Sequence, residues 1–208
     1  MARFRLEREP IEMPVLFGAG AAVWDAVCAI ADALTEVPWT IVGGQMVYLL
    51  GVEYGAAAHR VTTDIDAAVD LRAAPDGVND LVAVLTALDF ESAGPSPDGH
   101  AYRFERHTLG GVAAVDLVPD EEDDQVLVVD VLAPEGLGTR ADLSRAFPAK
   151  GISQALARTE LLPIRVAAKV HWVPRPSLLG AIVSKATALA VDTRTRSATA
   201  STSPSSAA

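Results

Sequence analysis

Two aspartates separated by a single residue lie in the segment RVTTDID, residues 60–66. The segment has the composition of a strand, so Asp64 and Asp66 should point to one face, about 7 Å apart, with Ile65 facing the core. Neighbouring carboxylates repel each other unless protons or cations intervene, and a divalent cation with oxygen ligands is the usual solution. The pair therefore indicates a cation site. The alternative is a solvated strand face, which is the commoner setting for an Asp-x-Asp pair alone.

A third carboxylate, Asp116, lies inside the strand-like run GVAAVDLV, residues 111–118. If this run pairs beside residues 64–71, three acids from two strands can hold two magnesium ions ~3.5–4 Å apart, as in phosphoryl transfer. Taken alone, Asp116 is weaker evidence for a site than the Asp-x-Asp pair, because aspartate is common at strand ends. Asp70 has the same parity as Asp64, but we expect it too far along the strand to share the site.

Two glycines, Gly43 and Gly44, separate a short apolar run at 38–42 from a helical run at 45–52. A strand, a glycine turn and a helix together allow backbone N–H groups and a helix N-terminus to bind phosphate. The alternative is a tight turn without a ligand. Because one helix separates this turn from Asp64 and Asp66, both features can open onto the same side of the fold.

The elements that must position these residues follow from the spacing of apolar side chains. Helices are predicted at 19–35, 45–52 and 78–88, and strands at 38–42, 64–71, 101–107, 111–118 and 125–132. This order predicts an α+β fold with α/β-like character, in which a mixed sheet is covered by helices on one face.

The pattern changes after about residue 134, where a short helix or turn at 151–159 precedes strands within 161–173 and a helix at 176–191. The last residues are small, polar and without periodicity, which is typical of disorder. We therefore predict a core domain at 15–133, a C-terminal extension of helix and strand at 134–195, and a disordered tail at 196–208.

The composition restricts the class of protein. The chain has 208 residues, is 50% hydrophobic and carries a net charge of −10, which argues against a surface coated with positive charge for duplex nucleic acid. Its one cysteine, Cys28, fits a reducing compartment. The first residues, MARFRLEREP, do not have the composition of a signal peptide, and no apolar run is long enough to span a membrane. We expect a cytoplasmic protein.

Three segments together resemble a known family: VGGQMVYLLG, RVTTDIDAAVDL and VAAVDLV. They are similar to the nucleotidyltransferase superfold shared with DNA polymerase beta, and more narrowly to the AbiEii and MenT-type toxins of bacterial toxin–antitoxin systems. The family segment Arg-x-Ser/Thr-x-Asp-hydrophobic-Asp and the later third aspartate are matched in order by Arg60, Thr62, Asp64, Asp66 and Asp116. The resemblance covers about residues 18–195 and implies a nucleotidyltransferase-type fold.

The resemblance also implies an activity, the transfer of a nucleoside monophosphate from a nucleoside triphosphate. Two Mg²⁺ ions, with Mn²⁺ as a substitute, would be held by Asp64, Asp66 and Asp116, and Asp116 would help activate the acceptor hydroxyl. The implied nucleotide-binding residues are Gly43, Gly44, Arg60, Thr62 and Lys185. Lys185 equally fits a lysine that extends from an apolar helix to water, and Arg60 an ordinary surface residue.

For the MenT-type toxins the implied acceptor is the 3′ end of tRNA, and the implied protein partner is a cognate antitoxin. A basic surface for tRNA would come from a C-terminal group of five residues: Arg158, Arg165, Lys169, His171 and Arg175. A solvated strand face explains these residues equally well. The alternatives for function are a nucleotidyltransferase acting on a small molecule or on a protein, and a catalytically impaired member that acts only by binding a partner.

The chain departs from the family at its C-terminus. Members of the family end in a helical segment with a Lys/Arg-Asp-x-x-Asp motif, which does not follow Arg194 here. The Ala, Arg, Ser and Thr of this tail are typical of GC-rich DNA read in another frame. A frameshift that impairs activity is therefore a hypothesis, which translation of the other frame of the gene would test.

Overall fold

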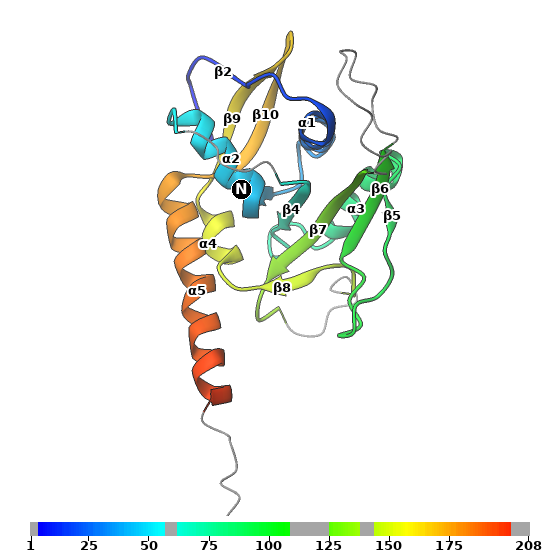
Figure 1. The fold of residues 1–208 in the computed structure, drawn as a ribbon, viewed down its shortest axis with the longest axis vertical. Helices are drawn as coiled ribbons and strands as arrows, with labels where there is room; N and C mark the ends of the chain where they lie inside the picture. The colour runs from blue at the N-terminus through cyan, green and yellow to red at the C-terminus, as the bar shows by residue number, and fades with distance from the viewer. Residues whose placement is uncertain (1–3, 57–61, 109–124, 138–143, 201–208) are drawn as a thin grey trace, which may run out of the picture.

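The computed structural model describes residues 4–56, 62–108, 125–137 and 144–200 (Figure 1). Its helices are α1 (Gly18–Ala33), α2 (Gly43–Glu53), α3 (Gly77–Ala87), α4 (Ile152–Ala157) and α5 (Leu178–Ala200). Together with two sheets they confirm the predicted mixed α+β class. Arg60, Asp116 and the strand predicted at 111–118 lie outside the described residues.

The larger sheet carries the Asp-x-Asp strand next to its edge strand β3 (Trp39–Val42). Its order is β3, β4 (Asp64–Val69), β7 (Gln125–Pro134), β6 (Arg103–Thr108) and β5 (Glu91–Ser92), with β8 (Phe147–Ala149) pairing at the end of β7. β4 runs antiparallel to β3 and parallel to β7, and β6 runs antiparallel to β7. The sheet is therefore mixed, and β4 has hydrogen-bonded neighbours on both sides.

The two faces of β4 are different. Ile65, Ala67 and Val69 are fully buried in the main core, together with apolar residues of α1 and α3. On the opposite face Ala68 packs with Ile152 of α4 in a smaller cluster. The prediction of helices on one face is therefore wrong, because the C-terminal part of the chain folds back and places α4 against the second face.

The second sheet consists of β1 (Phe4–Arg5), β2 (Ile11–Glu12), β9 (Thr159–Val166) and β10 (Lys169–Pro176). β9 and β10 form an antiparallel hairpin, and both N-terminal strands run parallel to β9. The hairpin belongs to the main core through apolar side chains such as Leu162, Ile164 and Val173. The N-terminal strands β1 and β2 are thus held in the fold by pairing with β9, which lies more than 140 residues later in the chain.

Helix α5 begins after Ser177, whose Oγ accepts a hydrogen bond from the Gly180 N–H at 3.3 Å. This is the contact that a serine makes at a helix N-terminus. The helix lies beside α4 and extends beyond the sheets (Figure 1), continuing through residues 196–200, for which the sequence predicts disorder. No glycine or proline interrupts residues 181–203, and alanine favours the helix. Among the described residues, none of the helices combines the length and the apolar character that crossing a membrane requires.

Candidate functional site

Three charged side chains lie in one row across the larger sheet. The register of the parallel pair β4–β7 places Asp66 opposite Asp130, and the register of the antiparallel pair β6–β7 places Arg103 opposite Asp130. Side chains in directly opposed positions point to the same face of a sheet. Asp66, Asp130 and Arg103 therefore share the face that also carries Asp64, beyond the part of β4 that α4 covers.

The Asp130–Arg103 contact is a bidentate ion pair. Arg103 Nε donates to Asp130 Oδ1 at 2.9 Å, and Nη2 donates to Oδ2 at 2.8 Å. This is the fork geometry in which arginine binds a carboxylate most specifically. The hydrogen bonds to Asp130 raise the pKa of Arg103 above its ordinary value, so the guanidinium remains charged.

The glycine turn lies directly against Asp66. Gly43 follows the extended residue Val42 and adopts φ +60°, a conformation that favours glycine, and α2 begins there. A Cβ at Gly43 would overlap Asp66 Oδ2, and a Cβ at Gly44 would overlap the side chain of Thr62. The missing side chains therefore leave the space in which the Asp66 carboxylate approaches the N-terminus of α2. The positive end of a helix dipole favours negative charge at this place.

A buried amide fixes the entry into β4. Gln45 of α2 is 1% exposed, and its Nε2 donates to the carbonyl oxygens of Thr62 at 2.6 Å and Asp64 at 3.3 Å. The Asp64 N–H donates to Thr62 Oγ1 at 3.1 Å. These bonds connect the glycine turn, through the first turn of α2, to the backbone of the Asp-x-Asp pair. Asp64 is exposed at the start of the strand.

The electrostatics of the site disfavour the charge on Asp66. Burial, and next the charge of Asp130, raise the pKa of Asp66; Asp64 adds to this effect, whereas Lys185 and Arg103 oppose it. Among the described side chains, no donor makes a hydrogen bond to the Asp66 carboxylate. A half-buried carboxylate next to two other acids is a group that a cation would stabilise.

Lys185 of α5 forms no ion pair in the described part of the chain. It is exposed and close enough to lower the pKa of Asp66. Its placement depends on the contact between α4 and α5, where Gly151, with φ +83°, leaves room for the Ser184 carbonyl. A Cβ at Gly151 would overlap that oxygen, so the glycine allows α5 to approach α4. Helix α4 packs on the face of β4 that carries Asp64 and Asp66.

The chemistry of the site fits a divalent cation at Asp64 and Asp66. Both are carboxylates on one face of β4. The space beside Gly43 that Asp66 occupies would be filled by any side chain at position 43. Within the described residues, however, no three histidine, cysteine or acidic side chains are arranged to hold a metal ion. Asp130 lies opposite Asp66 in the sheet, but both of its oxygens accept hydrogen bonds from Arg103. The expected third ligand, Asp116, lies outside the described residues.

Sequence reasoning did not identify Asp130, Arg103 or Gln45. The run QVLVVDVL, residues 125–132, contains a single charged residue, and a lone acid within an apolar strand was the available signal. Asp70, by contrast, lies outside the site as expected, where its Oδ1 accepts the Arg72 N–H at 3.1 Å in a local turn.

The predicted basic surface is not formed by the strand residues that were expected to supply it. Arg175 is 2% exposed and donates to Glu53 Oε1 at 2.8 Å and to Glu160 Oε2 at 2.7 Å. Arg165 Nε donates to Glu12 Oε1 at 2.7 Å. These two cations are neutralised by acids from β2, α2 and β9.

The two remaining basic residues of β10, Lys169 and His171, are also paired with an acid, Asp32. Lys169 Nζ donates to Asp32 Oδ2 at 2.6 Å, and His171 Nδ1 lies 3.1 Å from both oxygens of that carboxylate. Burial raises the pKa of Asp32, but the hydrogen bonds from Lys169 and His171 outweigh burial and hold it below its ordinary value. The hypothesis of a basic face is wrong for these residues because their partners come from distant parts of the sequence. Arg158, at the end of α4, and Lys169 are the exposed members of the predicted group, and Lys169 is paired with Asp32.

Thiol chemistry is not supported by the one cysteine. Cys28 is buried in α1, and burial, followed by the charges of Asp32 and Asp25, raises the pKa of its thiol to about 12. A thiol with such a pKa carries almost no thiolate at neutral pH and is a poor nucleophile.

No protein-family model matches the chain, and no curated protein has a matching sequence. Among solved structures, the chain is similar to the solution structure of the antibiotic-resistance factor ANT(2'')-Ia, with a TM-score of 0.31 and 16% identity over 64% of this chain and 67% of that chain.

Proposed function

We propose that this protein is a Mg²⁺-dependent nucleotidyltransferase that transfers a nucleoside monophosphate from a nucleoside triphosphate to an acceptor hydroxyl. The observation that carries the proposal is the contact between the glycine turn and the Asp-x-Asp strand. Gly43 has no side chain at the place where Asp66 Oδ2 lies, so a helix N-terminus and two carboxylates share one site. A helix N-terminus suits phosphate, and paired carboxylates suit the cation that accompanies a triphosphate.

Each residue has a role that follows from its place. Asp64 and Asp66 hold the cation, which when bound neutralises charge on the triphosphate. The backbone at Gly43 and Gly44 meets the β- and γ-phosphates, and Lys185 adds positive charge from the exposed side. The acceptor oxygen attacks the α-phosphorus, a new P–O bond forms, and pyrophosphate leaves. Arg60, Thr62 and Asp116 keep the roles that the resemblance gives them: nucleotide contact for the first two, cation binding and activation of the acceptor hydroxyl for Asp116.

The finer proposal, drawn from the sequence resemblance, is that the acceptor is the 3′ end of tRNA and that the protein is a toxin neutralised by an antitoxin. A second candidate, a small hydroxyl compound as acceptor, is favoured by one observation. Arg165, Lys169 and Arg175 are paired with acids, so they do not offer free cations to a polyanion. The net charge of −10 points in the same direction.

The test is incubation of the full chain with each of the four nucleoside triphosphates labelled at the α-phosphate, with Mg²⁺, total tRNA and cell extract. Magnesium-dependent label on tRNA supports the toxin, whereas label on a small molecule or on a protein supports a nucleotidyltransferase of another specificity. Asp66→Asn and Asp64→Asn should abolish labelling while the protein remains folded. Absence of label from a folded wild-type protein would contradict the proposal and favour a member that acts only by binding.

A further inference from the structure

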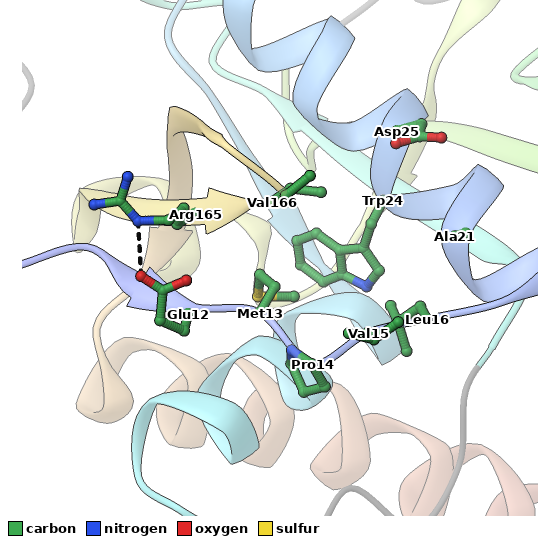
Figure 2. Close-up of a pocket in the computed structure, with 11 residues that line it drawn as sticks. Glu12, Met13, Pro14, Val15, Leu16, Ala21, Trp24, Asp25, Arg165 and Val166 are labelled. Carbon is green, nitrogen blue, oxygen red and sulfur yellow. Dashed lines mark hydrogen bonds and ion pairs between the residues drawn. The ribbon is translucent and has the colours of Figure 1, made fainter.

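A cavity of about 320 Å³ opens where the N-terminal segment passes between α1 and the end of β9 (Figure 2). One wall is residues 12–16, a second is a face of α1 with Ala21, Trp24 and Asp25, and the third is residues 165–167 at the end of β9. The Met13 N–H donates to the Arg165 carbonyl at 3.0 Å and joins the first wall to the third. The volume lies at the lower end of the range of about 300–1,000 Å³ that small-molecule sites have. The residues of the Asp-x-Asp site do not line this cavity.

The floor of the cavity is apolar and aromatic. Trp24 is 2% exposed, and Figure 2 shows its indole ring in the middle of the lining side chains. The ring centroid lies 5.8 Å from that of Tyr48 of α2, so the indole is packed on its other side. Met13, Leu16 and Val166 pack against the main core. The folded chain therefore holds ready an aromatic surface that an apolar body can cover.

The charged groups around the cavity leave an excess of negative charge. Arg165 Nε donates to Glu12 Oε1 at 2.7 Å, so these two charges balance each other. Asp25 is exposed on the other side of Trp24, and within the described residues it forms no ion pair (Figure 2). The chain as a whole carries a net charge of −10, which adds to the attraction for cations.

We infer that this cavity binds a small organic amine, with its apolar body on Trp24 and its ammonium group at the acidic rim beside Asp25. The apolar side chains cover the body, while the ammonium group keeps contact with water, so its charge is not buried without a partner. The face of an indole also attracts a cation directly. A carboxylate or phosphate on the same body would be repelled by Asp25. The inference concerns a second site and does not depend on the proposed nucleotidyl transfer.

The test is a titration of the full chain with phenethylamine and, in parallel, with 3-phenylpropionate, which carries a carboxylate on the same phenylethyl body. The readout is the set of indole N–H signals in a ¹⁵N-correlated NMR spectrum, in which Trp24→Phe identifies the signal of Trp24. Phenethylamine should shift that signal to saturation and leave the signal of Trp39, 1% exposed in the core, unchanged. It should bind about tenfold more tightly than 3-phenylpropionate, because the rim attracts one probe and repels the other.

Four variants locate the recognition of the amine. Asp25→Asn should weaken phenethylamine binding about threefold, the effect of one exposed charge pair. Asp80→Asn, the same change at an exposed position of α3, is the matched control and should have no effect. Glu12→Gln/Asp25→Asn leaves Arg165 without an acid among the lining residues and should reverse the preference in favour of 3-phenylpropionate. Ala21→Leu fills the cavity and should abolish the binding of both probes.

Three results would overturn the inference. The first is the absence of a saturable shift at Trp24 with phenethylamine. The second is equal binding of the two probes to the wild type, because the cavity would then select an apolar body and not an amine. The third is a preference for phenethylamine that persists in the double variant Glu12→Gln/Asp25→Asn. Asp66→Asn should bind phenethylamine as the wild type does, so a failure of the proposed function leaves this site unaffected.

Discussion

Asp66 and Asp130 lie directly opposite each other on neighbouring parallel strands and point to the same face of the sheet. Two carboxylates in such positions repel each other, and Arg103 balances only one of them. The other, Asp66, lies against the N-terminus of α2, next to Asp64, without a hydrogen-bond donor among the described side chains. The sheet therefore holds one partly buried carboxylate that has no hydrogen-bond donor among the described side chains, at the place where the sequence predicts a cation.

The first prediction concerns the pH dependence of stability in the presence of a chelator. Burial and the charge of Asp130 raise the pKa of Asp66 above its ordinary value of 3.8, so the folded state binds this proton more tightly than the unfolded chain. The stability that protonated Asp66 contributes is complete at pH values below the ordinary pKa of 3.8. It is lost as the pH rises through the raised pKa of the folded state. Asp66→Asn cannot ionise, so its free energy of unfolding relative to the wild type should increase over this window.

Urea denaturation from about pH 4 to about pH 8 measures this difference. Asp98→Asn, in the exposed loop before β6, is the matched control and should show no such trend. An Asp66→Asn protein that becomes less stable than the wild type as the pH rises would show that the charge on Asp66 is already compensated in the fold.

The second prediction compares glycines at the two ends of α2. Gly43 and Gly55 both have positive φ, +60° and +66°, so alanine should cost about 1 kcal/mol of stability at either position. At Gly55 no atom lies within 4 Å of an added Cβ, whereas at Gly43 the Cβ would overlap Asp66 Oδ2. Gly43→Ala should therefore be the less stable variant and should weaken Mn²⁺ binding about tenfold, whereas Gly55→Ala should bind as the wild type does. Equal effects of the two substitutions on Mn²⁺ binding would exclude a role for the contact with Asp66.

The third prediction concerns Gln45. Replacement by leucine removes the donor to the Thr62 and Asp64 carbonyls, and leaving buried polar groups without a partner costs about 1–3 kcal/mol. Gln45→Leu should lower the free energy of unfolding by this amount and weaken Mn²⁺ binding, because the start of β4 is no longer fixed. Thr40→Val is the control, since the Thr40 hydroxyl is equally buried but makes only 3.4 Å contacts, one of them to the second sheet. It should leave Mn²⁺ binding unchanged. If Gln45→Leu is destabilised but binds Mn²⁺ normally, Gln45 has a structural role only.

The fourth prediction concerns the ion pair between Arg175 and Glu53, which are 2% and 4% exposed. Arg175→Met leaves the buried Glu53 carboxylate with Arg8 as its one ion-pair partner among the described residues and should cost about 3–5 kcal/mol in free energy of unfolding. The double variant Arg175→Met/Glu53→Met should recover most of that loss, because two apolar side chains replace a paired charge. Losses that simply add in the double variant would show that the pair is not coupled.

The local elements of the site could be predicted from the sequence. The apolar run at residues 38–42 contains β3, and the helix predicted at 45–52 lies within α2, which begins two residues earlier at Gly43. Asp64 begins β4, with Ile65 facing the core as the strand alternation required. Each of these predictions uses only a few consecutive residues, whose turn chemistry and periodicity act locally.

The partners of these elements could not be predicted in the same way. Asp130 reaches Asp66 through the register of a parallel pair, and register depends on contacts between segments more than 50 residues apart. The basic residues of β9 and β10 were misinterpreted for a related reason. Their acidic partners, such as Asp32 and Glu53, belong to helices that the hairpin meets only in the folded chain.

The most direct test of the account is calorimetric titration of the full chain with a non-hydrolysable nucleoside triphosphate analogue, with and without Mg²⁺, for the wild type and for Asp66→Asn. The account predicts that the wild type binds the analogue far more tightly with Mg²⁺ than without it, and that Asp66→Asn, folded at the same temperature, loses this dependence. Binding of the analogue that ignores both Mg²⁺ and Asp66 would contradict it.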